Sequence, residues 1–111
     1  MNVARSKSVS TALASSPPWR LNVGCGRNAL AGWVNVDAAA LPGVDIVCDL
    51  EAVRARPIAL PDESVESFLL SHVIEHVRDS LGLMQELWRL ARPAKRELIA
   101  LPHIVISLVH P

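Results

Sequence analysis

Three short apolar runs near the start of the chain each end on glycine or aspartate, and this pattern limits the possible folds more than any other. The runs RLNV (20–23), WVNV (33–36) and DIVC (45–48) precede Gly24, Asp37 and Asp49 in turn. Several are apolar on successive residues, which is typical of strands covered on both faces. Two further runs, VESFLLSHV (65–73) and ELIAL (97–101), extend the series. The sequence therefore predicts a parallel sheet of about five strands.

The segment between the fourth and fifth runs predicts a helix over Asp79–Arg92, with Asp79 or Ser80 as its N-cap. Its apolar residues fall at i, i+3, i+4 and i+7, which places one stripe against the core: Met84, Leu87, Trp88 and Ala91. Glu86 is expected on the solvated face as a partner of Arg89. Strands alternating with helical or loop crossovers indicate an α/β fold.

Composition restricts the class of protein. The chain has 111 residues, enough for one domain, and 50% of them are hydrophobic, which argues against a disordered chain. Eleven basic and eleven acidic residues give zero net charge, so non-specific nucleic-acid binding is not expected. Cys25 and Cys48 fit reduced thiols of a cytoplasmic protein. No apolar run approaches the roughly 20 residues of a membrane-spanning helix.

Residues 1–18 differ from the rest of the chain. They are rich in serine, contain Arg5 and Lys7 but no acid, and end at Pro17-Pro18. This composition predicts a disordered leader before a domain at residues 19–103. It also fits a transit peptide loosely, because such segments are basic and poor in acids.

The strand ends carry the candidate chemistry. Glycines at 24 and 26 let the backbone approach a ligand closely, because glycine lacks Cβ and tolerates positive φ, although a ligand-free turn uses the same residues. Asp37 is placed to accept hydrogen bonds from ribose hydroxyls. Asp49 ends the next strand. Since open α/β sheets bind ligands at the carboxyl edge, the sequence predicts a nucleotide site there.

Five phrases in order extend this pattern: LNVGCG (21–26), GWVNVD (32–37), DIVCDLE (45–51), LPDESVESFLLSHVIEHV (60–77) and LMQELWRLARP (83–93). Together they resemble the class I S-adenosylmethionine-dependent methyltransferases, in particular the small type 11-like branch, over residues 19–103. The resemblance implies a Rossmann-like open parallel sheet and S-adenosylmethionine as the cofactor. It names neither a methyl acceptor nor a catalytic residue.

The resemblance also implies the residues that contact the cofactor. Gly24, Cys25 and Gly26 would form the turn against its methionine part, and Asp37 would hold the ribose. Asp49 with Leu50 would lie beside the adenine, and His72 would close the pocket. Many members carry an acid where this chain has Asn22, whose amide can still hydrogen-bond the cofactor's ammonium.

Two features depart from the full family fold, which has seven strands. The connection from Gly26 to Trp33 leaves room for a first helix of one or two turns at most. The chain ends soon after the fifth run, so the last strands are expected to be missing and the edge of the fifth strand to invite self-association. The apolar tail, residues 104–111, is an alternative extra strand, antiparallel to the fifth.

Because the last strands are expected to be missing, the alternative to an active methyltransferase is a truncated, non-catalytic relative that binds cofactor or a partner.

The histidines suggest a competing hypothesis, a zinc hydrolase. HVIEH (72–76) matches the inverted zinc-protease signature, in which His72 and His76 would share one helical face with Glu75 as the base. The motif begins inside a predicted strand, so this zinc hydrolase is only a remote alternative and no metal site is predicted. Glu75 and His76 are expected to cap and line the pocket. His103, after the fifth run, is either a base at the ligand edge or a solvated loop residue.

Overall fold

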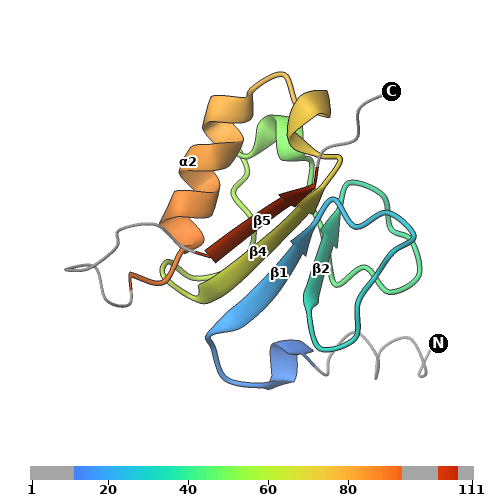
Figure 1. Cartoon of the computed structure of the whole chain (residues 1–111), viewed down its shortest axis with the longest axis vertical. Helices are drawn as coiled ribbons and strands as arrows, with labels where there is room; N and C mark the ends of the chain where they lie inside the picture. The colour runs from blue at the N-terminus through green and yellow to red at the C-terminus, as the bar shows by residue number, and fades with distance from the viewer. Residues whose placement is uncertain (1–11, 94–102, 108–111) are drawn as a thin grey trace.

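The computed structural model describes residues 12–93 and the backbone of residues 103–107. Five parallel strands form one sheet in the order β3-β2-β1-β4-β5 (Figure 1). The strands are β1 (Trp19–Val23), β2 (Val34–Asp37), β3 (Ile46–Val47), β4 (Val65–Ser71) and β5 (His103–Ser107). The helices are η1 (Leu50–Ala52), η2 (Ile74–His76) and α2 (Ser80–Leu90). The structure confirms the predicted α/β fold with a Rossmann-like parallel sheet.

The order of the strands reverses at β1. The chain first builds outward from β1 to β2 and β3, and then returns to add β4 on the other side of β1. Val23, the last residue of β1, is level with Val36 of β2 and Leu70 of β4. Ligands of open α/β sheets bind where the strand order reverses in this way. The sheet therefore positions the ends of β1, β2 and β4 around one candidate site.

The two faces of the sheet differ in chemistry. On one face, Leu21 and Val23 lie beside Phe68 and Leu70 in the sheet register, and all four are at most 1% exposed. They join the buried leucines of α2 in one hydrophobic cluster. The opposite face carries Asn22, which lies beside Asn35 in the register. The apolar face packs against α2 in the core. The face with Asn22 and Asn35 carries polar side chains that can form hydrogen bonds with the segments that cross it.

Helix α2 confirms the predicted helix and its cap, since the Asp79 carboxylate accepts a hydrogen bond from the Gly82 N–H at 3.0 Å. The predicted apolar stripe is confirmed at Leu87 and Ala91, which are buried, and at Met84, which packs against the core, but it was wrong at Trp88. Trp88 is 52% exposed, whereas the residues that face the core are Gly82, Leu83, Glu86, Leu87 and Leu90. Glu86 is only 7% exposed, so its predicted solvation was wrong too, although its pairing with Arg89 is confirmed.

The last strand differs from the prediction. Residues 97–101 lie outside the described residues, and the neighbour of β4 is His103–Ser107, with Leu69 beside Val105. The pairing of β5 with β4 is parallel, and the predicted antiparallel pairing of the tail with residues 97–101 lies outside the described residues. His103 is the first residue of β5 and lies at the amino edge of the sheet, opposite the edge to which it was assigned.

The N-terminal boundary of the packed region comes earlier than expected. Residues 12–14 form a helical turn whose Ala12 is 8% exposed and belongs to the core cluster (Figure 1). The indole N–H of Trp19 donates to the Ser15 carbonyl at 3.0 Å. Residues 1–11 lie outside the described residues. Within the described part of the chain, no helix is long and apolar enough to cross a membrane.

Candidate cofactor site at the carboxyl edge

The turn after β1 is held by β2. The N–H groups of Gly24 and Cys25 both donate to the Val36 carbonyl, at 2.7 and 3.1 Å. Gly24 and Gly26 have φ angles of 67° and 55°, in the left-handed region that favours glycine. A Cβ added at Gly24 would lie 2.6 Å from a methyl carbon of Val73, whereas a Cβ added at Gly26 would meet no other atom within 4 Å. Gly24 therefore serves packing, and Gly26 faces open space.

Asp37 contacts the glycine turn directly. Its Oδ1 accepts a hydrogen bond from the Gly26 N–H at 3.1 Å, and its Oδ2 accepts one from the Ala39 N–H at 2.9 Å. Each carboxylate oxygen has two acceptor positions, so a further donor can still bind. Asp37 thus fixes the turn and keeps acceptor capacity at the place predicted for a ribose.

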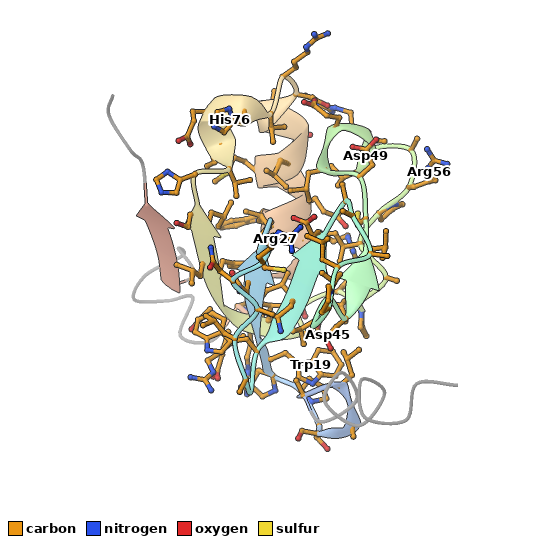
Figure 2. The ribbon with its side chains drawn as sticks, turned by 90° about the vertical axis from the view of Figure 1, so that its right-hand side faces the viewer. Trp19, Arg27, Asp45, Asp49, Arg56 and His76 are labelled. Atoms are coloured by element: carbon orange, nitrogen blue, oxygen red, sulfur yellow. The ribbon has the colours of Figure 1, made fainter. Side chains whose placement is uncertain are left out.

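The end of β3 also lies at the carboxyl edge of the sheet, where it is hydrogen-bonded to the end of β2. The Cys48 N–H donates to the Asp37 carbonyl at 2.8 Å. Asp49 follows, exposed to solvent, and its Oδ1 accepts from the Glu51 N–H at 2.9 Å, which caps η1 at Leu50. Figure 2 shows Asp49 at the same end of the molecule as His76, and Trp19 and Asp45 at the opposite end. The sheet therefore gathers Gly24, Asp37 and Asp49 on one rim, as the sequence predicted.

His72 directly follows β4 and has a φ angle of 58°, a conformation that is uncommon for residues other than glycine. Its side chain is 42% exposed, and its Nδ1 lies 3.7 Å from the Glu75 carboxylate. The next residue, Val73, packs against Gly24, so the chain that follows β4 reaches the glycine turn. Its predicted contact with the cofactor stays a prediction.

The HVIEH motif does not form a helical metal site. Residues 74–76 are a single short 3₁₀ turn, η2, and the left-handed φ of His72 separates it from that turn. His72 and His76 therefore do not share a face of one α-helix. Among residues 12–93, no group of three or more histidine, cysteine, aspartate or glutamate side chains is arranged to hold a metal ion.

The structure adds detail to two predicted contacts, those of Asn22 and Cys25, which stay predictions. Asn22 is 3% exposed, and its Nδ2 donates to the Asn28 carbonyl and to Asn35 Oδ1, both at 3.0 Å. Only its Oδ1 is left for a ligand's ammonium. Cys25 is 5% exposed, and burial, reinforced by the charge of Asp37, raises the pKa of its thiol. Cys25 can therefore meet a ligand through its backbone rather than as a thiolate.

Residues 21–96 match the family described as a methyltransferase domain, and this match covers more than half of the chain. The chain belongs to the methyltransferase domain family. The matched region of this methyltransferase domain runs from β1 through α2 and contains every rim residue described above. No curated protein resembles the chain closely enough to count as a match.

Sequence reasoning missed two residues that shape the rim of this methyltransferase domain. Val73 packs over Gly24, and Asn35 is 5% exposed with three hydrogen-bond partners in the preceding loop and in Asp45. No local pattern marks Val73, because its contact is with a residue 49 positions away. A signal for Asn35 was present, since both LNV and VNV place an asparagine between apolar strand residues.

Proposed function

We propose that this methyltransferase domain binds S-adenosylmethionine at the carboxyl edge of its sheet and transfers the methyl group to an acceptor. The observation that carries this proposal is the hydrogen bond between Gly26 and Asp37. It joins a backbone with open space beside it to a carboxylate that keeps free acceptor positions. An adenosyl ligand offers hydroxyl donors and a flat base, and both suit such a rim at a reversal of strand order.

The residues present fit the cofactor. Gly26 leaves the space that a Cβ would fill, and Asp37 is placed for the ribose hydroxyls. Asp49 and Leu50 at the end of β3 are proposed to lie beside the adenine, with His72 closing the far side. S-adenosylmethionine supplies a methyl group on a positively charged sulfonium sulfur. The contribution of the protein is to orient the ligand and the acceptor and to exclude water.

We also propose that the chain works in the cytoplasm. Cys25 and Cys48 are both free and buried, and burial raises the pKa of each thiol. Such thiols persist in a reducing compartment.

The test is calorimetric titration with S-adenosylhomocysteine, the demethylated product. Gly26→Ala is compared with Gly32→Ala, because both glycines have positive φ and the added methyl group meets no closer contact than 3.7 Å at either. Both variants are expected to lose about 1 kcal/mol of stability from backbone strain. Only Gly26→Ala is expected to weaken binding, by about tenfold. Equal effects of the two variants, or no binding by the unaltered chain, would contradict the proposal.

Methyl transfer requires a separate measurement. Release of S-adenosylhomocysteine from S-adenosylmethionine is followed with a panel of hydroxyl, amine and thiol acceptors. Turnover that depends on one acceptor class supports the transferase. Tight binding without turnover on any acceptor would instead indicate the non-catalytic cofactor-binding domain.

A further inference from the structure

The connection between β1 and β2 contains no helix. Residues 24–33 cross from the carboxyl edge to the start of β2 as a series of turns. Two backbone hydrogen bonds stay within this loop, from the Asn28 N–H to Cys25 and from the Trp33 N–H to Leu30. The glycine turn at the start of the loop is held to β2 by its bonds to the Val36 carbonyl and to Asp37, but these local turns do not attach residues 27–33 to the sheet. Because the loop begins with the glycine turn, whatever attaches it also sets the shape of the candidate site.

Two asparagine side chains on the polar face of the sheet make this attachment. Asn35 Nδ2 donates to the carbonyls of Leu30 and Trp33, at 3.0 and 3.2 Å, and Asn35 Oδ1 accepts from the Leu30 N–H at 2.9 Å. Asn22 Nδ2 donates to the Asn28 carbonyl and to Asn35 Oδ1, both at 3.0 Å. The loop backbone is thus hydrogen-bonded to β1 and β2 through side chains.

A carboxylate fixes the second asparagine. Asp45 Oδ2 accepts from the backbone N–H of Asn35 at 2.6 Å and from its Nδ2 at 3.3 Å. The segment before Asp45 also closes on the loop, since a Cβ at Gly43 would lie 2.6 Å from Cβ of Ala29. Among the described residues, no buried side-chain nitrogen or oxygen lacks a hydrogen-bond partner. Removing one member of this set therefore leaves another unpaired.

We propose that Asp45, Asn35 and Asn22 are positioning residues that hold the glycine turn in the conformation that binds the cofactor. This inference rests on the proposed function. The three side chains order a loop that has no helix to order its backbone. Asp45 lies at the amino end of β3, away from the rim, and acts through Asn35 rather than on the ligand (Figure 2).

The physical basis is preorganisation. A loop released from the sheet samples many backbone conformations, and ordering it again on binding costs affinity. Variants of the set should therefore weaken cofactor binding more than their effect on global stability explains. A residue with a purely structural role would lower stability and leave the affinity of the folded molecules unchanged.

The test compares Asp45→Ala with Asp45→Asn, which keeps an acceptor oxygen for the Asn35 N–H. Met84→Ala is the matched control, because Met84 is partly buried against the core from α2, on the apolar face of the sheet. Calorimetry gives the affinity for S-adenosylhomocysteine, and urea unfolding gives stability. Asp45→Ala is expected to lose about tenfold in affinity, while Asp45→Asn and Met84→Ala stay within about twofold of the unaltered chain.

A readout without ligand keeps this inference separate from the proposed function. The amide resonance of Gly26, which reports its bond to Asp37, is expected to shift and to exchange faster with solvent in Asp45→Ala, but not in Met84→Ala. An unmoved Gly26 amide, or an affinity loss no larger than that of Met84→Ala, overturns the inference. If the unaltered chain binds no S-adenosylhomocysteine, the proposed function fails. The Gly26 amide then still shows whether Asp45 holds the glycine turn: a shift in Asp45→Ala supports this, and an unmoved amide contradicts it.

Discussion

Gly24 and Gly26 are two residues apart and share a left-handed backbone, yet their neighbours differ. Val73 covers Gly24, and the side of Gly26 is open. The sequence predicts both glycines as a turn because G-x-G follows a strand, but it does not distinguish a packing glycine from a ligand-facing one. That distinction depends on which residue of β4 and its extension reaches the turn, and no local pattern encodes it.

Gly24→Ala tests the packing role. The added methyl group would overlap Val73, and positive φ adds strain, so the free energy of unfolding is expected to fall by about 2–4 kcal/mol. Val73→Ala removes the methyl groups that Gly24→Ala would meet, so the double variant should be more stable than the sum of the single effects predicts, by at least about 0.5 kcal/mol. Urea unfolding of the four proteins in the cycle measures this coupling. Strictly additive losses would show that the contact does not restrict Gly24.

At the scale of elements, the sequence predicts the limits of helix α2 better than its orientation. The helix and its Asp79 cap follow from local signals, which the structure confirms. Hydrophobic periodicity assigns Trp88 to the core and Glu86 to solvent, and both assignments were wrong. Glu86 is buried because distant groups satisfy it, and Ile58, 28 residues earlier, donates its N–H to the carboxylate at 2.8 Å.

Substitutions of Glu86 and Trp88 are therefore expected to rank in stability opposite to the order that the periodic pattern predicts. Glu86→Ala leaves the Ile58 N–H and the Arg89 guanidinium without their buried partner, and it is expected to cost about 3 kcal/mol. Trp88→Ala, at a position 52% exposed, is expected to cost less than about 1 kcal/mol. Thermal and urea unfolding rank the two. Glu86→Gln is the control, because it keeps an acceptor for Ile58 while removing the charge. A larger loss of stability for Trp88→Ala than for Glu86→Ala would contradict this ranking and support the assignment of Trp88 to the core.

For the molecule as a whole, the sequence predicts the parallel sheet and the rim, because the first three strand ends each carry a glycine or aspartate signal. It offers two segments for the last strand, residues 97–101 and the tail at 104–111, and does not decide which of them pairs with β4. ELIAL and HIVIS both favour strands, and the structure pairs residues 103–107 with β4 through a register that local composition does not contain. The polar attachment of the β1–β2 loop was missed for a similar reason, since Asn22 and Asn35 become neighbours only when the two strands pair.

The charge balance of the whole chain predicts weak binding to nucleic acids. With eleven basic and eleven acidic residues, it has no excess of cations to replace the counterions of a phosphate backbone. We expect labelled single- and double-stranded 20-nucleotide DNA and RNA to bind more weakly than about 100 μM in 150 mM salt, as measured by fluorescence anisotropy, with an oligolysine peptide as positive control. Micromolar binding that weakens steeply with salt would contradict this expectation. It would also require a local cluster of basic side chains, so that a nucleic acid rather than a small molecule would become the first acceptor to test.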